Sequence, residues 1–166
     1  MQWDTQKIIQ EMIENSKSFI EKPHSVFNNL PVCPFAKKAR LQNRLSYLVY
    51  PFDVTKEPMD EGRMLAEIAM FRTTSYHMAW FIHPDKGLPV KAYNRFFEAL
   101  RKAIRPEGLV AFAGHPDHTM AINGLFIRKD PYPNLQVIHK AELEIARTKL
   151  KQTNYYELLG EYDLDL

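Results

Sequence analysis

Apolar side chains recur at helical spacing in several segments of the chain. In the first, residues 5–21 carry their apolar side chains on one face, with Asp4 placed as the N-cap, and Lys22-Pro23 ends the pattern. Pro89 suits the first turn of another helix, because a backbone N–H would have no partner there. This periodicity predicts helices over 5–21, 59–72, 89–104 and 140–150.

Short apolar runs alternate with these helices. Residues 76–82 are apolar or aromatic apart from His77, as is typical of a strand covered on both faces, so this run is expected to be the central strand. Residues 135–138 fit either a short strand or the first turn of the last helix. An irregular loop is expected over 28–34, and further strands over 45–50, 108–113 and 123–127.

The alternation of strands and helices predicts the α/β class. We expect a single-domain sandwich in which helices flank a mixed sheet of three to five strands. Residues 1–166 are expected to form one domain, because the length suits one core and no linker, repeat or low-complexity stretch interrupts the chain. The predicted core comprises Ile13, Leu48, Met78, Trp80, Phe97, Leu100, Val110 and Phe112.

Composition narrows the function classes. Lys and Arg number 22 against 20 Asp and Glu, and they are scattered, so nothing indicates a nucleic-acid partner. No apolar run approaches the roughly 20 residues of a membrane span, so no membrane association is expected. The chain has 1 cysteine and starts without a signal-peptide pattern, which favours the cytoplasm. A homodimer is compatible with all of this.

The single cysteine is the first candidate for chemistry. Cys33 precedes Pro34, and a Cys-Pro pair in an ordered loop is a known setting for a thiolate bound to haem iron. Lys37, Lys38 and Arg40 follow closely, so the local field favours the thiolate, or binds an acidic group such as a propionate or phosphate. The alternative is a small buried hydrophobic residue, which describes most lone cysteines.

A second candidate is the segment 114–118, directly after a predicted strand. Ligand clefts form at strand ends in α/β sheets, so His115 and Asp117 are predicted to line the principal pocket. Together with His118 they could bind a metal ion. The alternative is a polar turn in which Asp117 accepts backbone hydrogen bonds. Among the other histidines, His77 is expected in the core, and surface positions are expected for His24, His83 and His139.

Residues 128–133 form a proline-rich connector that is expected to be rigid. Arg128, with the Asp and Tyr of this loop, could clamp a carboxylate or guanidinium substrate and add positive charge to the pocket, although a solvated connector explains the composition as well. The chain contains no P-loop, dinucleotide fingerprint, nucleophile elbow or Cys-x-x-Cys pair. The common nucleotide, hydrolase and zinc-ribbon functions are therefore not indicated.

These motifs carry two resemblances. The Cys33-Pro34-Phe35-Ala36 motif, the His115 segment and the sequence 130–135 resemble a family of short uncharacterised bacterial proteins over most of the chain. More loosely, the layout is similar to the YqcI/YcgG family of haem-dependent oxygenases, which hydroxylate nitrogen atoms of amino acids such as arginine. Cys33, the segment 112–114 and the loop 128–133 occupy corresponding places, although here the proline follows the cysteine.

The resemblance to the oxygenases implies a first hypothesis, a haem b-dependent monooxygenase acting on a nitrogen of an amino acid or related small metabolite. It would use an external electron donor, because the chain has no flavin or iron-sulfur signature. The iron would be held by Cys33 or His115, and Pro34, Phe112 and His118 would adjoin the cofactor. The alternatives are a haem- or metal-binding sensor or carrier, and a non-haem metal enzyme using His115, Asp117 and His118.

Overall fold

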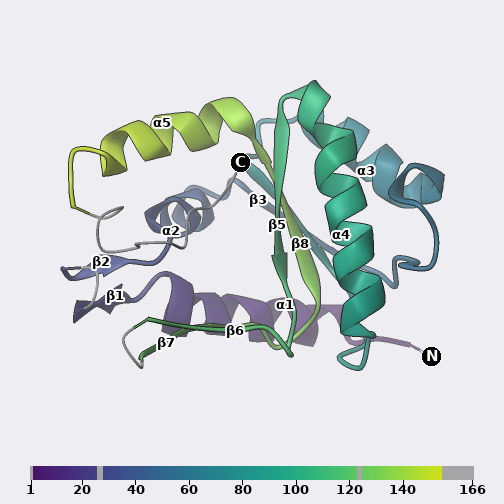
Figure 1. The fold of residues 1–166 in the computed structure, drawn as a ribbon, viewed down its shortest axis with the longest axis horizontal. Helices are drawn as coiled ribbons and strands as arrows, with labels where there is room; N and C mark the ends of the chain where they lie inside the picture. Colours follow the sequence, from purple (N-terminus) through teal and green to yellow (C-terminus); the bar gives the residue numbers. More distant parts are fainter. Residues whose placement is uncertain (1, 26–27, 123–124, 155–166) are drawn as a thin grey trace.

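The computed structural model describes residues 2–25, 28–122 and 125–154. Its centre is a four-stranded sheet in the order β3-β4-β8-β5 (Figure 1). Strand β3 pairs in parallel with β4, whereas β8 runs antiparallel between β4 and β5, so the sheet is mixed. The predicted α/β class is confirmed. The strands are β3 (Leu45–Val49), β4 (Met78–Ile82), β5 (Leu109–Gly114) and β8 (Asn134–His139).

Four of the five helices in the described residues form where the sequence periodicity predicts them, with corrected ends, whereas the helix over Pro34–Leu41 was not predicted. Asp4 caps the first helix, since its carboxylate accepts a hydrogen bond from the Lys7 N–H at 3.0 Å. The helix predicted over 59–72 begins only at Gly62, because Glu61 is its N-cap and accepts from the Met64 N–H at 2.6 Å. The helices are α1 (Thr5–Asn15), α2 (Pro34–Leu41), α3 (Gly62–Arg72), α4 (Val90–Ile104) and α5 (Lys140–Leu150).

Shorter elements connect these helices and strands. The first predicted helix changes at residue 16 into a π-helix, η1 (Ser16–Ile20), and 3₁₀ turns η3 (Pro58–Asp60) and η4 (Arg105–Glu107) adjoin α3 and α4. Two small antiparallel ribbons lie apart from the main sheet, and of their strands only the last overlaps one expected from the sequence, over 123–127. They pair β1 (Pro23–His24) with β2 (Leu30–Pro31), and β6 (Thr119–Ile122) with β7 (Leu125–Lys129).

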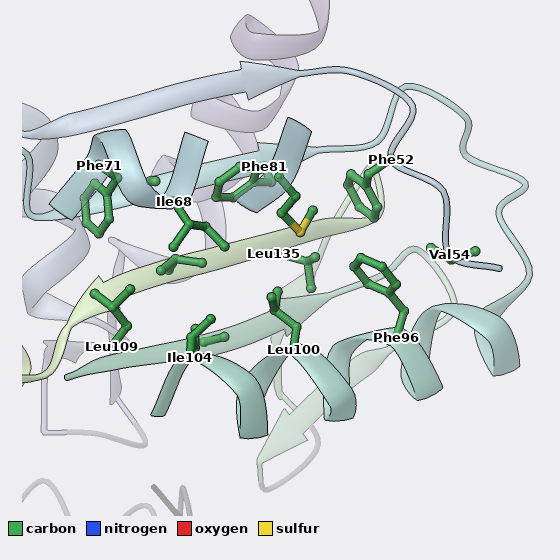
Figure 2. Packing of buried hydrophobic residues seen from close by; sticks show 14 of the residues in the cluster. Phe52, Val54, Ile68, Phe71, Phe81, Phe96, Leu100, Ile104, Leu109 and Leu135 are labelled. Atoms are coloured by element: carbon green, nitrogen blue, oxygen red, sulfur yellow. The ribbon is translucent and has the colours of Figure 1, made fainter. Parts of the chain in front are cut away.

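Helices α3 and α4 cover one face of the sheet, and the largest apolar cluster lies between them and the strands (Figure 2). The buried face of α4 carries Phe96, whereas Phe97, expected in the core, is only partly buried. Helical spacing explains why Phe96 is the buried one. Tyr93, Phe96 and Leu100 follow each other at intervals of three and four residues, so they share the face of α4 that meets the sheet.

Helices α1, α2 and α5 cover the opposite face, which makes three layers. The side chains of Met78, Val110 and Ile138 pack there against α2 and α5. Trp80 and Ile82 pack against Ile8 and Met12 of α1. Of the predicted core, Met78, Trp80, Leu100 and Val110 are buried, while Ile13, Leu48, Phe97 and Phe112 are partly exposed.

No helix in the described part of the chain is long and apolar enough to cross a membrane.

The burial of Trp80 on β4 yields a stability prediction. Its side chain packs against α1, and its indole N–H donates to Asn134 Oδ1 at 2.5 Å. Trp80→Ala should lower the free energy of unfolding in urea by about 3–5 kcal/mol, since loss of the indole leaves a cavity and removes one of the two hydrogen bonds to Asn134 Oδ1. Leu41→Ala, at a side chain that is 64% exposed, is the control and should change it by no more than about 0.5 kcal/mol. Similar losses in both variants would contradict the packing described for β4.

Candidate functional site

The carboxyl ends of β4 and β5 carry the same tripeptide. His83-Pro84-Asp85 follows β4, and His115-Pro116-Asp117 follows β5. In each turn the histidine Nδ1 accepts a hydrogen bond from the N–H two residues ahead, at 3.2 Å from Asp85 and 3.1 Å from Asp117. Both imidazoles are buried, although the sequence placed His83 at the surface. The repeated geometry indicates that these histidines stabilise strand-to-loop turns.

The second nitrogen of His115 is engaged as well. Nε2 lies 2.8 Å from the Leu88 carbonyl oxygen, which can only accept, so Nε2 carries the proton and Nδ1 is the acceptor for Asp117 N–H. The ring is 1% exposed, whereas the residue Asp117 is on the surface and its side chain is 70% exposed. A bond from His115 to a metal would therefore require one of these two hydrogen bonds to break.

The structure does not assemble the predicted three-residue metal site. The rings of His115 and His118 lie 5.5 Å apart between centroids, at an angle of 50°. The residues that the structure describes contain no group of three or more His, Cys, Asp or Glu side chains that could hold a metal ion. Arg128 lies on β7 opposite Met120, and the predicted role of its side chain falls outside the described residues.

The Tyr93 hydroxyl joins the ends of β5 and β8. Gly114 and Asn134 face each other in the sheet register, yet the hydroxyl lies between them. It accepts from the Gly114 N–H at 3.0 Å and donates to the Asn134 carbonyl at 2.6 Å. The Asn134 amide in turn donates to the Tyr132 carbonyl at 3.0 Å. These polar groups satisfy one another's hydrogen-bonding capacity, so the bridge ties α4 to the ends of β5 and β8.

Tyr93→Phe tests this bridge with almost no change in shape. The variant leaves the buried Gly114 N–H and Asn134 carbonyl without their shared partner, which should cost about 1–3 kcal/mol in urea unfolding. Tyr76→Phe, at an exposed ring, is the matched control and should be neutral. An unchanged stability in Tyr93→Phe would show that the two strands close the gap by a direct hydrogen bond.

Cys33 lies on the other side of the sheet from Tyr93, at the start of α2. It is the N-cap residue, with extended backbone, and Pro34 fills the first helical turn. Its N–H donates to the Ile20 carbonyl at 3.0 Å, which ties α2 to the end of η1. The partly exposed Cys33 packs against the cluster between the sheet and α2 and α5, as does Phe112. Two of the predicted cofactor residues, Cys33 and Phe112, therefore adjoin one cluster.

A row of large side chains crosses all four strands on this face. Tyr47, Trp80, Gln136 and Phe112 are register partners on β3, β4, β8 and β5. The Tyr47 and Trp80 rings lie 5.7 Å apart. The Tyr47 hydroxyl is buried and has no hydrogen-bond partner among the described residues, and burial raises its pKa to about 12. The row gives this face an apolar, largely aromatic surface with few polar groups.

A partly buried ion pair borders this row, and no sequence pattern indicated it. Arg40 on α2 donates to both oxygens of Glu21, at 2.9 Å from Nε to Oε1 and 2.7 Å from Nη2 to Oε2. The Ser16 hydroxyl adds a bond of 3.0 Å to Oε1. Glu21, 5% exposed, directly follows the π-helix η1, a rare element that often occurs at functional sites. The two residues lie 19 positions apart, so local patterns could not reveal the pair.

His77, which was expected in the core, lines a separate cavity of about 410 Å³. His77 and His139 flank the register pair Met78 and Ile138 at this end of β4 and β8. Nδ1 of His77 lies 3.9 Å from a Glu142 oxygen. Burial lowers the pKa of His139, although the nearby Glu142 acts in the opposite direction. Neither this cavity nor the one between α4 and α5 described below is lined by His115 or Asp117.

Comparison with protein-family models, with curated proteins and with solved structures finds no match for this chain. The candidate site is therefore defined by its geometry: Cys33, the aromatic row beside it, and the ion pair that holds α2 in place.

The ion pair predicts a specific pH dependence. Burial alone would raise the Glu21 pKa, but the hydrogen bonds from Arg40 and Ser16 outweigh it and hold the pKa below the ordinary value of 4.5. Because the folded-state pKa is depressed, the stabilisation is present above pH 4.5 and is lost as the pH falls through the folded-state value. Glu21→Gln should therefore lower the free energy of unfolding by roughly 1–3 kcal/mol at pH 7. As the pH falls below 4.5, the stability of this variant should decline less than that of the unsubstituted protein.

Glu98→Gln is the control for this measurement, since Glu98 forms an exposed pair with Arg101 at 2.8 Å. It should cost no more than about 0.5 kcal/mol. Urea unfolding at several pH values between 3 and 7, read by fluorescence, gives both curves. If Glu21→Gln retains the full acid dependence of the unsubstituted protein, other carboxylates dominate, and the assigned role of the pair is wrong.

Proposed function

We propose that this protein is a haem-dependent oxygenase that hydroxylates a nitrogen of an amino acid or related small metabolite, with the Cys33 thiolate on the iron of haem b. The observation that carries the proposal is the position of Cys33. It is partly exposed at the N-terminus of α2 and adjoins the same apolar cluster as Phe112. The sequence resemblance to haem-dependent N-oxygenases supports the same chemistry.

The surroundings of Cys33 favour the anionic form of the thiol. Cys33 is the N-cap of α2, so it lies at the positive end of the helix dipole. Lys37 in the first turn of α2 and Lys38 in its last turn, both exposed, add positive charge. The thiolate is the form of cysteine that binds metals, so this environment suits an iron ligand. The same lysines could pair with carboxylates at the edge of a bound porphyrin.

The aromatic character of the neighbouring sheet face supports a flat apolar cofactor as the ligand. Tyr47, Trp80 and Phe112 present aromatic side chains in register, and Phe112 and Tyr47 are only partly buried. Oxygen activation needs such a water-poor environment. The residues do not fit His115 as a ligand, because backbone groups occupy both of its nitrogens. The proposal therefore rests on Cys33 alone for the proximal position.

The chain's own residues would hold and orient Cys33. The Glu21–Arg40 pair and the bond from Cys33 N–H to Ile20 fasten α2 to η1 at two points. When bound through a thiolate, haem supplies activation of dioxygen, because thiolate donation favours cleavage of the oxygen–oxygen bond. One oxygen atom enters the nitrogen–hydrogen bond of the substrate. The other leaves as water with two protons and two electrons from an external reductant.

Reconstitution with haem b tests this directly. The ferrous carbonyl complex should show the red-shifted Soret band typical of thiolate ligation, and Cys33→Ala should abolish it. His139→Ala, at a partly exposed histidine whose ring stacks on Phe71 of α3, is the matched control and should leave the band in place. With reductant and oxygen present, an amino acid carrying a side-chain nitrogen should gain the mass of one oxygen atom.

Other spectra would decide against the proposal. No haem uptake removes the oxygenase function, and an imidazole-type band that persists in Cys33→Ala removes Cys33 as ligand. A low-spin ferrous form that does not bind carbon monoxide would have both axial positions of the iron filled. That result would indicate a sensor or carrier and not an enzyme.

A further inference from the structure

We propose that the corner between α4, β5 and α5 is a binding site for a small polyanion, a molecule carrying phosphate or several carboxylates. This inference is independent of the proposed oxygenase function. A cavity of about 320 Å³ lies here, with Leu109, Val110 and Ala111 of β5 along one wall. Four cationic side chains line the rest, from the end of α4, from η4 and from the start of α5: Arg101, Lys102, Arg105 and Lys140.

Most of this positive charge has no counterpart in the protein. Arg101 pairs with Glu98 at 2.8 Å. No carboxylate of the described residues forms an ion pair with Lys102, Arg105 or Lys140. The nearest acidic residues along the chain are engaged elsewhere: Glu107 pairs with Arg72 at 2.7 Å, and Glu142 lies 3.9 Å from His77. An anion from solution would supply the missing charge.

Helix stability does not explain all four cations. Basic side chains in the last turn of a helix interact favourably with its dipole, which accounts for Arg101 and Lys102 on α4. Lys140, however, is the first residue of α5, where a positive charge opposes the dipole. Its presence therefore works against the helix that carries it. A bound anion would make the position of Lys140 favourable, since both Lys140 and the N-terminus of α5 attract the anion.

The shape of the site favours a small ligand. The volume is at the lower end of the range of roughly 300–1,000 Å³ for small-molecule pockets. The cations come from separate elements and surround one concave space, so they can contact a single compact anion together. Guanidinium groups bind phosphate and carboxylate in a bidentate manner, and ammonium groups bind phosphate as point charges. Inorganic pyrophosphate and citrate are suitable probes for the two chemistries.

Calorimetric titration and thermal unfolding with pyrophosphate test the proposal. Pyrophosphate should bind and raise the melting temperature, because it stabilises only the folded state. Lys102→Ala, Arg105→Ala and Lys140→Ala should each weaken binding by about tenfold, as expected for loss of a charged hydrogen bond. Lys91→Ala, exposed near the N-terminus of α4, is the control and should bind normally.

A second readout separates a ligand site from a structural role. Without anion, Lys140→Ala should be at least as stable as the unsubstituted protein, because it removes a charge that opposes the α5 dipole. Citrate binding in addition to pyrophosphate assigns the site to polyanions in general, and its absence assigns it to phosphates. The proposal is overturned if neither probe binds at millimolar concentration, if the three variants bind like Lys91→Ala, or if only a long oligonucleotide binds.

Discussion

The insertion of β8 between β4 and β5 is the constraint on which the remaining architecture depends. Strands β4 and β5 run in the same direction, and β8 runs against both, so residues 134–138 of β8 meet a partner on each side. Leu135 and Val137 fill the core toward α3 and α4, while Ile138 packs toward α2 and α5. One short strand thereby contributes side chains to the apolar clusters on both faces of the sheet, between the two helical layers (Figure 1).

The start of β8 also organises the polar groups at the carboxyl edge of the sheet. Asn134 accepts from Trp80 with its side chain and from Tyr93 with its carbonyl oxygen. His83 N–H donates to the neighbouring Pro133 carbonyl at 2.8 Å. Strand ends in α/β proteins are usual places for ligands, yet here the buried polar groups mostly bind one another. The two His-Pro-Asp turns thus have a structural explanation that does not require a ligand.

The candidate functional site lies around α2, on the face of the sheet that α1, α2 and α5 cover. A thiol at a helix N-terminus, an aromatic row and a partly buried ion pair lie on elements that are far apart in the sequence, and η1 connects them. Glu21 follows η1 and holds Arg40, while Ile20 holds the backbone of Cys33. The π-helix shifts the residues after it relative to an α-helix of the same length, which places Glu21 toward α2. The cationic cavity around Lys140, at the start of α5, is separate from this site.

The sequence by itself determined the elements whose patterns are local. The helices over 89–104 and 140–150, the N-cap at Asp4 and the buried strand at 78–82 follow from periodicity, capping residues and a continuous apolar run. The α/β class follows from their alternation. Cys33 could be singled out because the chain has no other cysteine.

Only the tertiary structure decided what depends on distant partners. Residues 134–139 form a strand because β4 and β5 offer edges on both sides, which local periodicity cannot show. Phe96 is buried in place of Phe97 because the sheet selects which side of α4 faces inward. His115 serves a turn because Leu88, 27 residues away, accepts its ring N–H. The Glu21–Arg40 pair arises in the same way, since hydrogen bonds of buried groups are satisfied by whatever the fold brings near.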